Sequence, residues 1–384
     1  MNSFISGKLD FRSRLVVWAI GISFFVMIAA LAISAGFRVE IRKGISELTG
    51  DIMMTSVHQN WYSESDPVHS EPSYKSRLEE VKGVRSIEPV IYRAGIVKTD
   101  DAIKGVLFKG EGDGYGELNV SVPSKFAEEM HLGAGDRITC YFVGEKVKIR
   151  KFTISDIYES LLGSDGDLIV KTSFDELQRL NGWEGDQASA IEIRVDRSYA
   201  GMEKTKAVSD ELAGISLMYS NEEEDPLVSS TAAERYSQLF DWLNLIDHNV
   251  IAILALMIIV AGFNMISGLL IMLFRNIGTI GTFKALGMTD KAVSRVYLRV
   301  AAGTVLNGMA AGVGAALLFC LVQGTTHLIK LNPESYFVSY VPVHVSAPAV
   351  IAVCAIAFAA ILLMLTLPCR FISKVDPADT MRAG

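Results

Sequence analysis

The side chains best suited to metal binding or nucleophilic catalysis are six histidines and four cysteines, and their spacing predicts neither function. The histidines are scattered along the chain at His58, His69, His131, His248, His327 and His344. No two of them have the spacing of a zinc site. The sequence also lacks the GxxxxGK[ST], HExxH and GxSxG patterns. We therefore predict a non-enzymatic chain that has no catalytic residue and binds no metal or cofactor itself.

The segment from position 275 to 290, RNIGTIGTFKALGMTD, has the pattern of a docking helix rather than of a plain polar loop. Its apolar residues recur at helical spacing, at Ile277, Ile280, Phe283 and Leu286. Gly287 is expected to end this helix, and a second helix is expected to run from Thr289 or Asp290 towards Tyr297. A short amphipathic helix needs a partner for its apolar face, which could be a lipid surface or a soluble protein.

Four long apolar segments surround this helix, at positions 15–36, 250–274, 300–329 and 347–367. None of them contains Asp, Glu, Lys or Arg. At a rise of about 1.5 Å per residue, each is long enough to cross a hydrocarbon core of roughly 30 Å. We predict a membrane protein with four transmembrane helices, one before and three after a large α+β domain at positions 37–247.

Basic residues predict the orientation, because basic loops stay on the cytoplasmic side. They outnumber acidic residues in the N-terminus (1–14), the loop between the second and third apolar segments (275–299) and the tail (368–384). We expect these three in the cytoplasm and 37–247 and 330–346 in the periplasm. A cleaved signal peptide is the alternative for the first apolar segment. That segment is longer than the usual apolar core of about 7–15 residues.

The predicted periplasmic region carries a net charge of −14, whereas the rest of the chain carries +7. Such acidity argues against nucleic-acid binding and suits a solvated domain or a basic partner. Its sequence pattern predicts stalk helices at 37–48 and 230–247. Strands are expected at 87–97, 103–108, 137–143, 147–158, 167–171, 190–195 and 215–219. Helices are expected at 123–130, 173–180 and 199–212.

This order of elements predicts two small α+β subdomains, the second beginning near position 167. Ser173 and Glu176 have the spacing of a capping box. The stretch from His58 through Trp61 to Ser73 resembles an exposed loop.

Polar and small residues within the spans predict helix packing. Asn264, Asn307 and Gln323 are expected to form hydrogen bonds between helices. Gly308 and Gly312 form a GxxxG motif, where another helix of this chain or of a second chain could approach closely. The lack of charged residues in the spans argues against an ion-coupled transporter.

The segment TIGTFKALGMTDKAV (279–293) resembles the signature of FtsX-like permeases of ABC transporters. The resemblance implies that the short helix docks into a groove on a separately encoded ATPase. The residues implied in this coupling are Ile280, Gly281, Phe283, Lys284, Ala285, Leu286 and Gly287. The family often has an acidic residue where this chain has Thr279, so a contact made by that carboxylate is not expected here.

The segments RKFTISDIYE (150–159), LNGWEGDQ (180–187), FDWLNLIDHNV (240–250) and LNPESYFVSYVP (331–342) resemble lipoprotein-releasing permeases of the LolC/LolE type. The resemblance implies an inner-membrane permease that pairs with a second copy or a homologous permease and with an ATPase that uses ATP. It also implies lipoprotein cargo that passes to a periplasmic chaperone.

Three alternative functions stay open. Two share this architecture: a MacB-like exporter, although no ATPase lies on this chain, and an FtsX-like regulator of cell-wall hydrolases. The third is a membrane-anchored periplasmic receptor or scaffold. That function does not explain the presence of the amphipathic helix.

Overall fold

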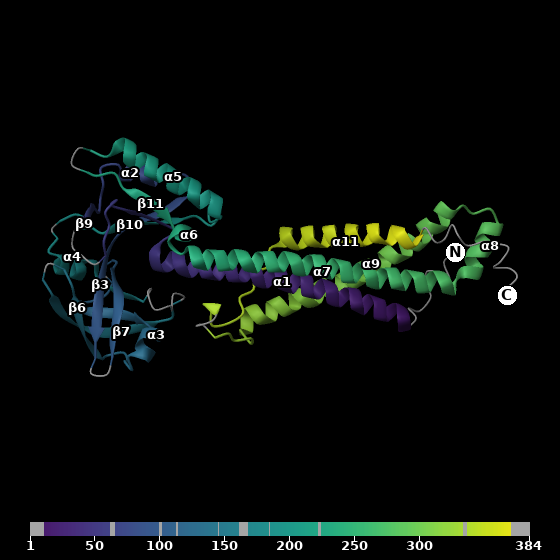
Figure 1. Ribbon diagram of the computed structural model, residues 1–384, viewed down its shortest axis with the longest axis horizontal. Coiled ribbons are helices and arrows are strands. Elements are labelled where there is room, and N and C mark those ends of the chain that lie inside the picture. Colours follow the sequence, from purple (N-terminus) through teal and green to yellow (C-terminus); the bar gives the residue numbers. More distant parts are fainter. Residues whose placement is uncertain are drawn as a thin grey trace. The chain divides into compact units, whose positions relative to one another are not determined.

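The computed structural model describes residues 11–61, 66–99, 102–112, 114–144, 146–160, 168–183, 185–221, 224–332 and 336–369. The chain forms two compact units (Figure 1). The helical unit comprises residues 1–39, 242–330 and 340–384, and the α+β domain comprises 40–241 and 331–339. The predictions for residues 1–10, for the strand start at Asp167 and for the tail after Cys369 lie outside the described residues.

Four helices have the length and composition of membrane spans: α1 (Phe11–Thr49), α7 (Ser237–Arg275), α9 (Asp290–Thr326) and α11 (Ala347–Cys369). They confirm the predicted arrangement of one span before and three after a large domain. α9 ends before the predicted position 329, because His327 adopts a left-handed backbone conformation with φ 48°. The buried Gln323 side chain donates hydrogen bonds to the carbonyls of Ile329 (3.3 Å) and Val341 (3.1 Å), and so holds the turn that follows.

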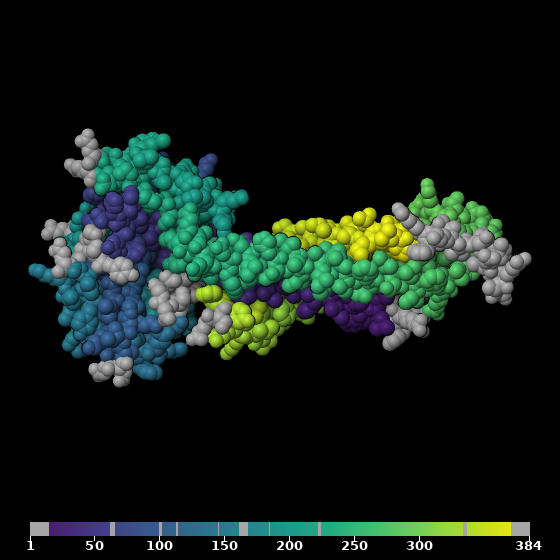
Figure 2. Space-filling view, viewed as in Figure 1, coloured from purple at the N-terminus to yellow at the C-terminus, as the bar shows by residue number. Residues whose placement is uncertain are grey.

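The helical unit packs around an apolar core to which α1, α7, α9, α11 and the short helix α8 (Ile277–Ala285) all contribute. α7 lies close to α11 at Gly262, where Met364 occupies the space that a Cβ would take, and close to α1 at Gly268 beside Val16. Figure 2 shows α7 and α11 side by side. The outward side chains remain apolar, as a hydrocarbon environment requires. Phe263, Leu318 and Leu363 are examples.

Six strands of the α+β domain form a closed barrel, because the first strand in the ring also pairs with the last. The ring order is β3 (Val84–Lys98), β4 (Ile103–Gly110), β8 (Ile169–Thr172), β5 (Asn119–Pro123), β7 (Lys148–Tyr158) and β6 (Arg137–Phe142). Alternation along the strands turns the rings of Phe108, Phe142 and Phe152 into the barrel core. The helices α3 (Ser124–Glu129) and α4 (Phe174–Asn181) cover that core.

The first half of β3 leaves the barrel and joins a second sheet. Its other strands are β10 (Ala190–Val195), β1 (Ile52–Thr55) and β11 (Val228–Thr231). The helices α2 (Lys75–Glu79) and α5 (Met202–Tyr219) pack on this sheet and share its core. The short strands β2 (Val68–His69) and β9 (Gln187–Ala188) pair separately, and α6 (Ala232–Arg235) leads towards α7.

The two cores confirm two subdomains, but the predicted boundary near position 167 is wrong. β8 and α4 complete the barrel, and the second subdomain combines β1 and α2 with the later elements from β9 to β11. The physical reason is the pairing of β1 with β10, which brings together residues that are distant in the sequence. Sequence order alone does not reveal such a pairing.

The strand predicted at 215–219 is also wrong, because these residues form the last turns of α5. Ser216 continues the buried helical face that contains Leu212, and its Oγ accepts a hydrogen bond from the Leu227 backbone N–H (2.8 Å). The stalk predicted at 230–247 is interrupted, since β11 occupies its start and Tyr236 separates α6 from α7.

Two local predictions near these elements need correction. Ser173 is the N-cap of α4 but makes no side-chain capping hydrogen bond, whereas Thr231 and Glu234 form a complete capping box at α6. Trp61 is half-buried and packs on Tyr92, with ring centroids 4.9 Å apart, so it is not part of an exposed loop.

Candidate functional site

The short helix predicted from the spacing of Ile277 to Leu286 is present as α8 (Ile277–Ala285), between α7 and α9. Asn276 breaks the chain direction after α7 with φ −107° and ψ 23°. At the other end, Gly287 has φ +91° and donates its N–H to the Lys284 carbonyl (2.9 Å), while Met288 donates to the Phe283 carbonyl (2.9 Å). This pair of bonds is a Schellman motif, which ends a helix at a left-handed glycine.

α8 has an inner and an outer face, and the predicted coupling residues are divided between them. Ile280 and Gly281 are buried, and Ile280 belongs to the core of the helical unit. On the outer face, Phe283 is 40% exposed and Leu286 is 80% exposed. Ala285 and Gly287 are exposed as well. An apolar side chain as exposed as Leu286 is available to a partner, whereas Ile280 already has one within the chain.

Lys284 connects α8 to the start of α9. Its Nζ lies 2.9 Å from Oδ1 of Asp290, and its side chain is 10% exposed. Asp290 stands in the first turn of α9, where a negative charge is favourable next to the helix N-terminus. The ion pair therefore fixes the angle between α8 and α9. Lys284 makes this contact from the covered side of α8.

The predicted packing motif joins two spans of the same chain. A Cβ on Gly308 would lie 2.7 Å from Cγ2 of Ile20, and one on Gly312 would collide with the backbone carbonyl of Gly21. Gly308 and Gly312 thus allow the backbones of α9 and α1 to touch. Among the predicted polar span residues, Gln323 bonds to the backbone of the following loop rather than to another helix.

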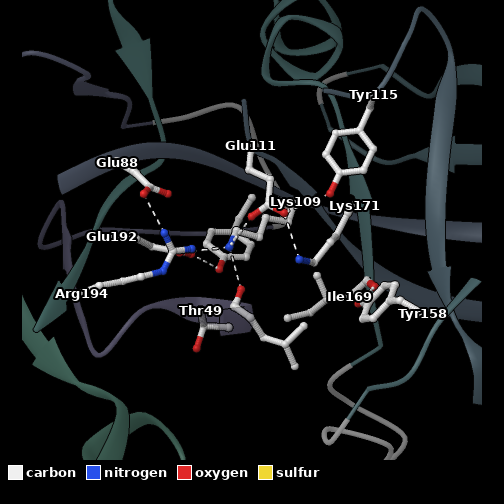
Figure 3. Close-up of polar contacts among 12 residues, drawn as sticks. Thr49, Glu88, Lys109, Glu111, Tyr115, Tyr158, Ile169, Lys171, Glu192 and Arg194 are labelled. Atoms are coloured by element: carbon white, nitrogen blue, oxygen red, sulfur yellow. Dashed lines mark hydrogen bonds and ion pairs between the residues drawn. The ribbon is translucent and has the colours of Figure 1, made fainter. Parts of the chain in front are cut away.

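The α+β domain contains a buried ion cluster that the sequence patterns did not predict (Figure 3). Lys109 on β4 is fully buried, and its Nζ lies 3.0 Å from a carboxylate oxygen of Glu192 and 2.8 Å from one of Glu111. Lys171 approaches the other oxygen of Glu111 at 2.9 Å. One signal could have revealed the cluster, since Lys109 directly follows the apolar run Val106–Phe108 in a buried strand.

The electrostatics of this cluster are set by burial and by two ammonium groups. Burial by itself raises the pKa of Glu111, but Lys109 and Lys171 outweigh it and lower that pKa to about 2. Glu192 also accepts a hydrogen bond from the Tyr92 hydroxyl (2.5 Å), and burial followed by the Glu192 charge raises the pKa of Tyr92. The Glu111 carboxylate is therefore charged at neutral pH.

Comparisons with known proteins give a family match and several distant relatives. Residues 251–377 match the family model described as FtsX-like permease C-terminal. The chain is 21% identical over 408 residues to the lipoprotein-releasing system transmembrane protein LolC of Xylella fastidiosa (strain Temecula1 / ATCC 700964). That alignment covers 98% of this chain and 95% of the relative. LolE of Haemophilus influenzae is 20% identical, over 94% of this chain and 92% of LolE.

The periplasmic region of MacB from Actinobacillus actinomycetemcomitans aligns in structure with a TM-score of 0.31 and 11% identity, over 52% of this chain and 97% of that chain. The family match begins within α7 and continues through α8, α9 and α11, so it includes the short helix α8 and the glycines Gly308 and Gly312. Residues 251–377 are thus similar to the C-terminal region of FtsX-like permeases, and the chain is a multi-pass membrane protein with four spans and a large α+β domain between the first span and the other three.

Proposed function

We propose that this chain is the non-catalytic permease subunit of an ABC transporter complex, and that the complex releases lipoproteins from the inner membrane to a periplasmic chaperone. The observation that supports this function best is the geometry of α8. It is a short helix between two spans, with Leu286 and Phe283 exposed on one side and Ile280 buried on the other. Such a helix can receive a push from a soluble partner and pass it to the spans.

The partner is a separate ATPase that uses ATP, and α8 docks into a groove on it. Leu286 supplies the apolar anchor, because buried apolar side chains dominate the energy of such contacts. Ile280, Gly281 and the Lys284–Asp290 pair hold α8 on the helical unit, so that a displacement of α8 also displaces α7 and α9.

The sidedness of this function follows from the charge distribution. Arg275, Lys291, Arg295 and Arg299 flank α8 and favour a cytoplasmic position. The acidic α+β domain then lies in the periplasm, and both termini lie in the cytoplasm. A second copy or a homologous permease completes the membrane part of the complex.

The cargo proposal is supported by two relatives, LolC and LolE, whose names describe a lipoprotein-releasing system and which align over nearly their full length. The helical unit presents outward apolar side chains along every span, which is compatible with lipid-attached cargo.

The test is reconstitution of the chain with its ATPase in vesicles that carry a triacylated lipoprotein. We expect ATP to release the lipoprotein to a soluble acceptor protein, and a non-hydrolysable ATP analogue to leave it in the vesicles. ATP hydrolysis without release would refute lipoprotein as the cargo. Failure of the chain to bind any ATPase would refute the permease function itself.

A further inference from the structure

The point at which α1 ends has the features of a hinge. α1 reaches into the α+β domain and stops at Thr49, and Gly50 then turns the chain into β1 with φ +67°. A Cβ at Gly50 would lie 3.1 Å from the Glu192 side chain. Glycine loses the most conformational freedom when it is fixed, so an unsupported helix end at this residue would pivot easily.

The last three carbonyls at this point each accept a hydrogen bond from a cationic side chain. Lys109 Nζ donates to the Leu48 carbonyl (2.6 Å). Arg235 Nη2 donates to the carbonyls of Thr49 (2.8 Å) and Gly50 (2.9 Å). The end of a helix carries unpaired carbonyls and a partial negative charge, so cations bind there favourably.

The two cations come from different parts of the domain. Lys109 stands on β4 of the barrel, and Figure 3 shows it between Glu111 and Glu192. Arg235 is the last residue of α6, which leads towards α7, and its Nη1 also donates to the Ser230 carbonyl (2.8 Å). The end of α1 is thus joined to the barrel on one side and to the segment before α7 on the other.

Burial makes these bonds costly to break. Lys109 is fully buried and Glu192 is 1% exposed, so loss of the Lys109 ammonium leaves the Glu192 carboxylate as an uncompensated buried charge. Charge-assisted hydrogen bonds are also short and directional. Such directional bonds fix the angle between the groups that they join, whereas contacts between apolar side chains do not.

Asp51, the residue after Gly50, also helps to hold the end of α1 in place. Its Oδ2 accepts hydrogen bonds from Ser46 Oγ (2.9 Å) on α1 and from the Val195 N–H (3.0 Å) on β10. Its carbonyl accepts from the Ala232 N–H (2.8 Å) of α6. Both sides of Gly50 are therefore bound to the sheet and to α6.

We infer that Gly50 is a locked hinge, and that Lys109 and Arg235 are positioning residues that hold α1 at a fixed angle to the barrel. A tilt of the last turns of α1, residues 40–49, then carries the barrel with it. The mechanical purpose of this lock rests on the proposed function, whereas the lock itself does not.

The test uses a variant that removes the bond to Leu48 and still leaves no buried charge without a partner. In K109M/E192Q both charges are neutralised together, which avoids the cost of a lone carboxylate. K171M is the matched control. Lys171 pairs with Glu111 from β8, and within the described part of the chain none of its contacts reaches α1.

Spin labels at Lys43→Cys on α1 and Ile103→Cys on β4 report the angle, in a chain whose four native cysteines are replaced by alanine. Both positions are exposed and lie in the α+β domain. We expect a narrow distance distribution for the parent chain and for K171M, and a broad one for K109M/E192Q. A narrow distribution in K109M/E192Q would overturn the lock.

The reconstituted complex supplies the second readout. In K109M/E192Q we expect ATP hydrolysis to continue while lipoprotein release per ATP falls about tenfold, which is within the range typical of residues that modulate coupling between sites. Unchanged release per ATP would refute the role of Lys109 in transmission. If the parent complex releases no lipoprotein but the label distances behave as expected, the proposed cargo fails and the locked hinge stands.

Discussion

α1 is held in two different ways along its length. In the helical unit it meets α9 through Gly21, Gly308 and Gly312, where backbone lies against backbone. In the α+β domain its end is held by Lys109 and Arg235 through charge-assisted hydrogen bonds. Charges are expensive inside a membrane, so helices there associate through small residues and close packing. The difference indicates that the membrane contact sets distance, whereas the contact in the α+β domain sets angle.

K109M alone is the substitution that we expect to weaken the contact at the end of α1 most strongly. This variant leaves the buried Glu192 carboxylate without its cation. We expect the free energy of unfolding of the α+β domain to fall by about 3–5 kcal/mol. Urea titration monitored by protease resistance measures it. K171M should lower the free energy of unfolding far less, since the side chains of Lys171 and Glu111 keep partial contact with solvent. Equal stability of K109M and the parent would contradict a structural role for the ion cluster.

Acid should weaken the same region through Glu111. The pKa of Glu111 is about 2 in the folded chain and about 4.5 when exposed. The stabilisation from this carboxylate is therefore complete above pH 4.5 and is lost as pH falls from 4.5 towards 2. We expect a loss on the order of 2–3 kcal/mol over that window. The difference between the parent and E111Q in acid titrations isolates it, and a difference that is independent of pH would contradict the assignment.

The membrane contact can be tested by adding one methyl group. In G312A the new Cβ would collide with the Gly21 carbonyl and separate α1 from α9. We expect a loss of about 1–3 kcal/mol, typical of overpacking. G314A is the matched control, because a Cβ there would meet no atom within 4 Å. Thermal unfolding in detergent compares the two, and equal midpoints would show that α1 and α9 are not in close contact.

Among these substitutions, K284A is expected to change the stability of the chain least. Lys284 is mostly covered but Asp290 is half-exposed, so the ion pair should contribute less than about 1 kcal/mol. We expect normal stability and a weaker ATPase pairing, because α8 loses its brace to α9. A loss of folding comparable to that of K109M would show that Lys284 has a different role.

The parts of this molecule that sequence predicts well depend on local patterns. Apolar runs identified the four spans, and the spacing of Ile277, Ile280, Phe283 and Leu286 with Gly287 identified α8 and its end. Period-two alternation identified most strands of the barrel. Each of these signals lies within one short segment, so no knowledge of distant contacts is needed.

The parts that sequence missed depend on distant contacts. Barrel closure requires β6 to pair with β3, and the partners of Lys109 are Leu48, Glu111 and Glu192. Periodicity showed that Ile280 and Leu286 belong to one helix, but not which of them turns inward. The burial of Gly281 has a practical consequence, since an acidic substitution there would disturb packing as well as docking.

We propose that the outer face of α8 docks an ATPase, and L286D tests this docking most directly. Leu286 is 80% exposed, so the substitution should leave the fold intact. I103D provides the matched control, since Ile103 is 67% exposed and lies in the α+β domain. We predict that L286D loses co-purification of the ATPase whereas I103D retains it, with equal membrane insertion of both. Retention of the ATPase by L286D would contradict the account.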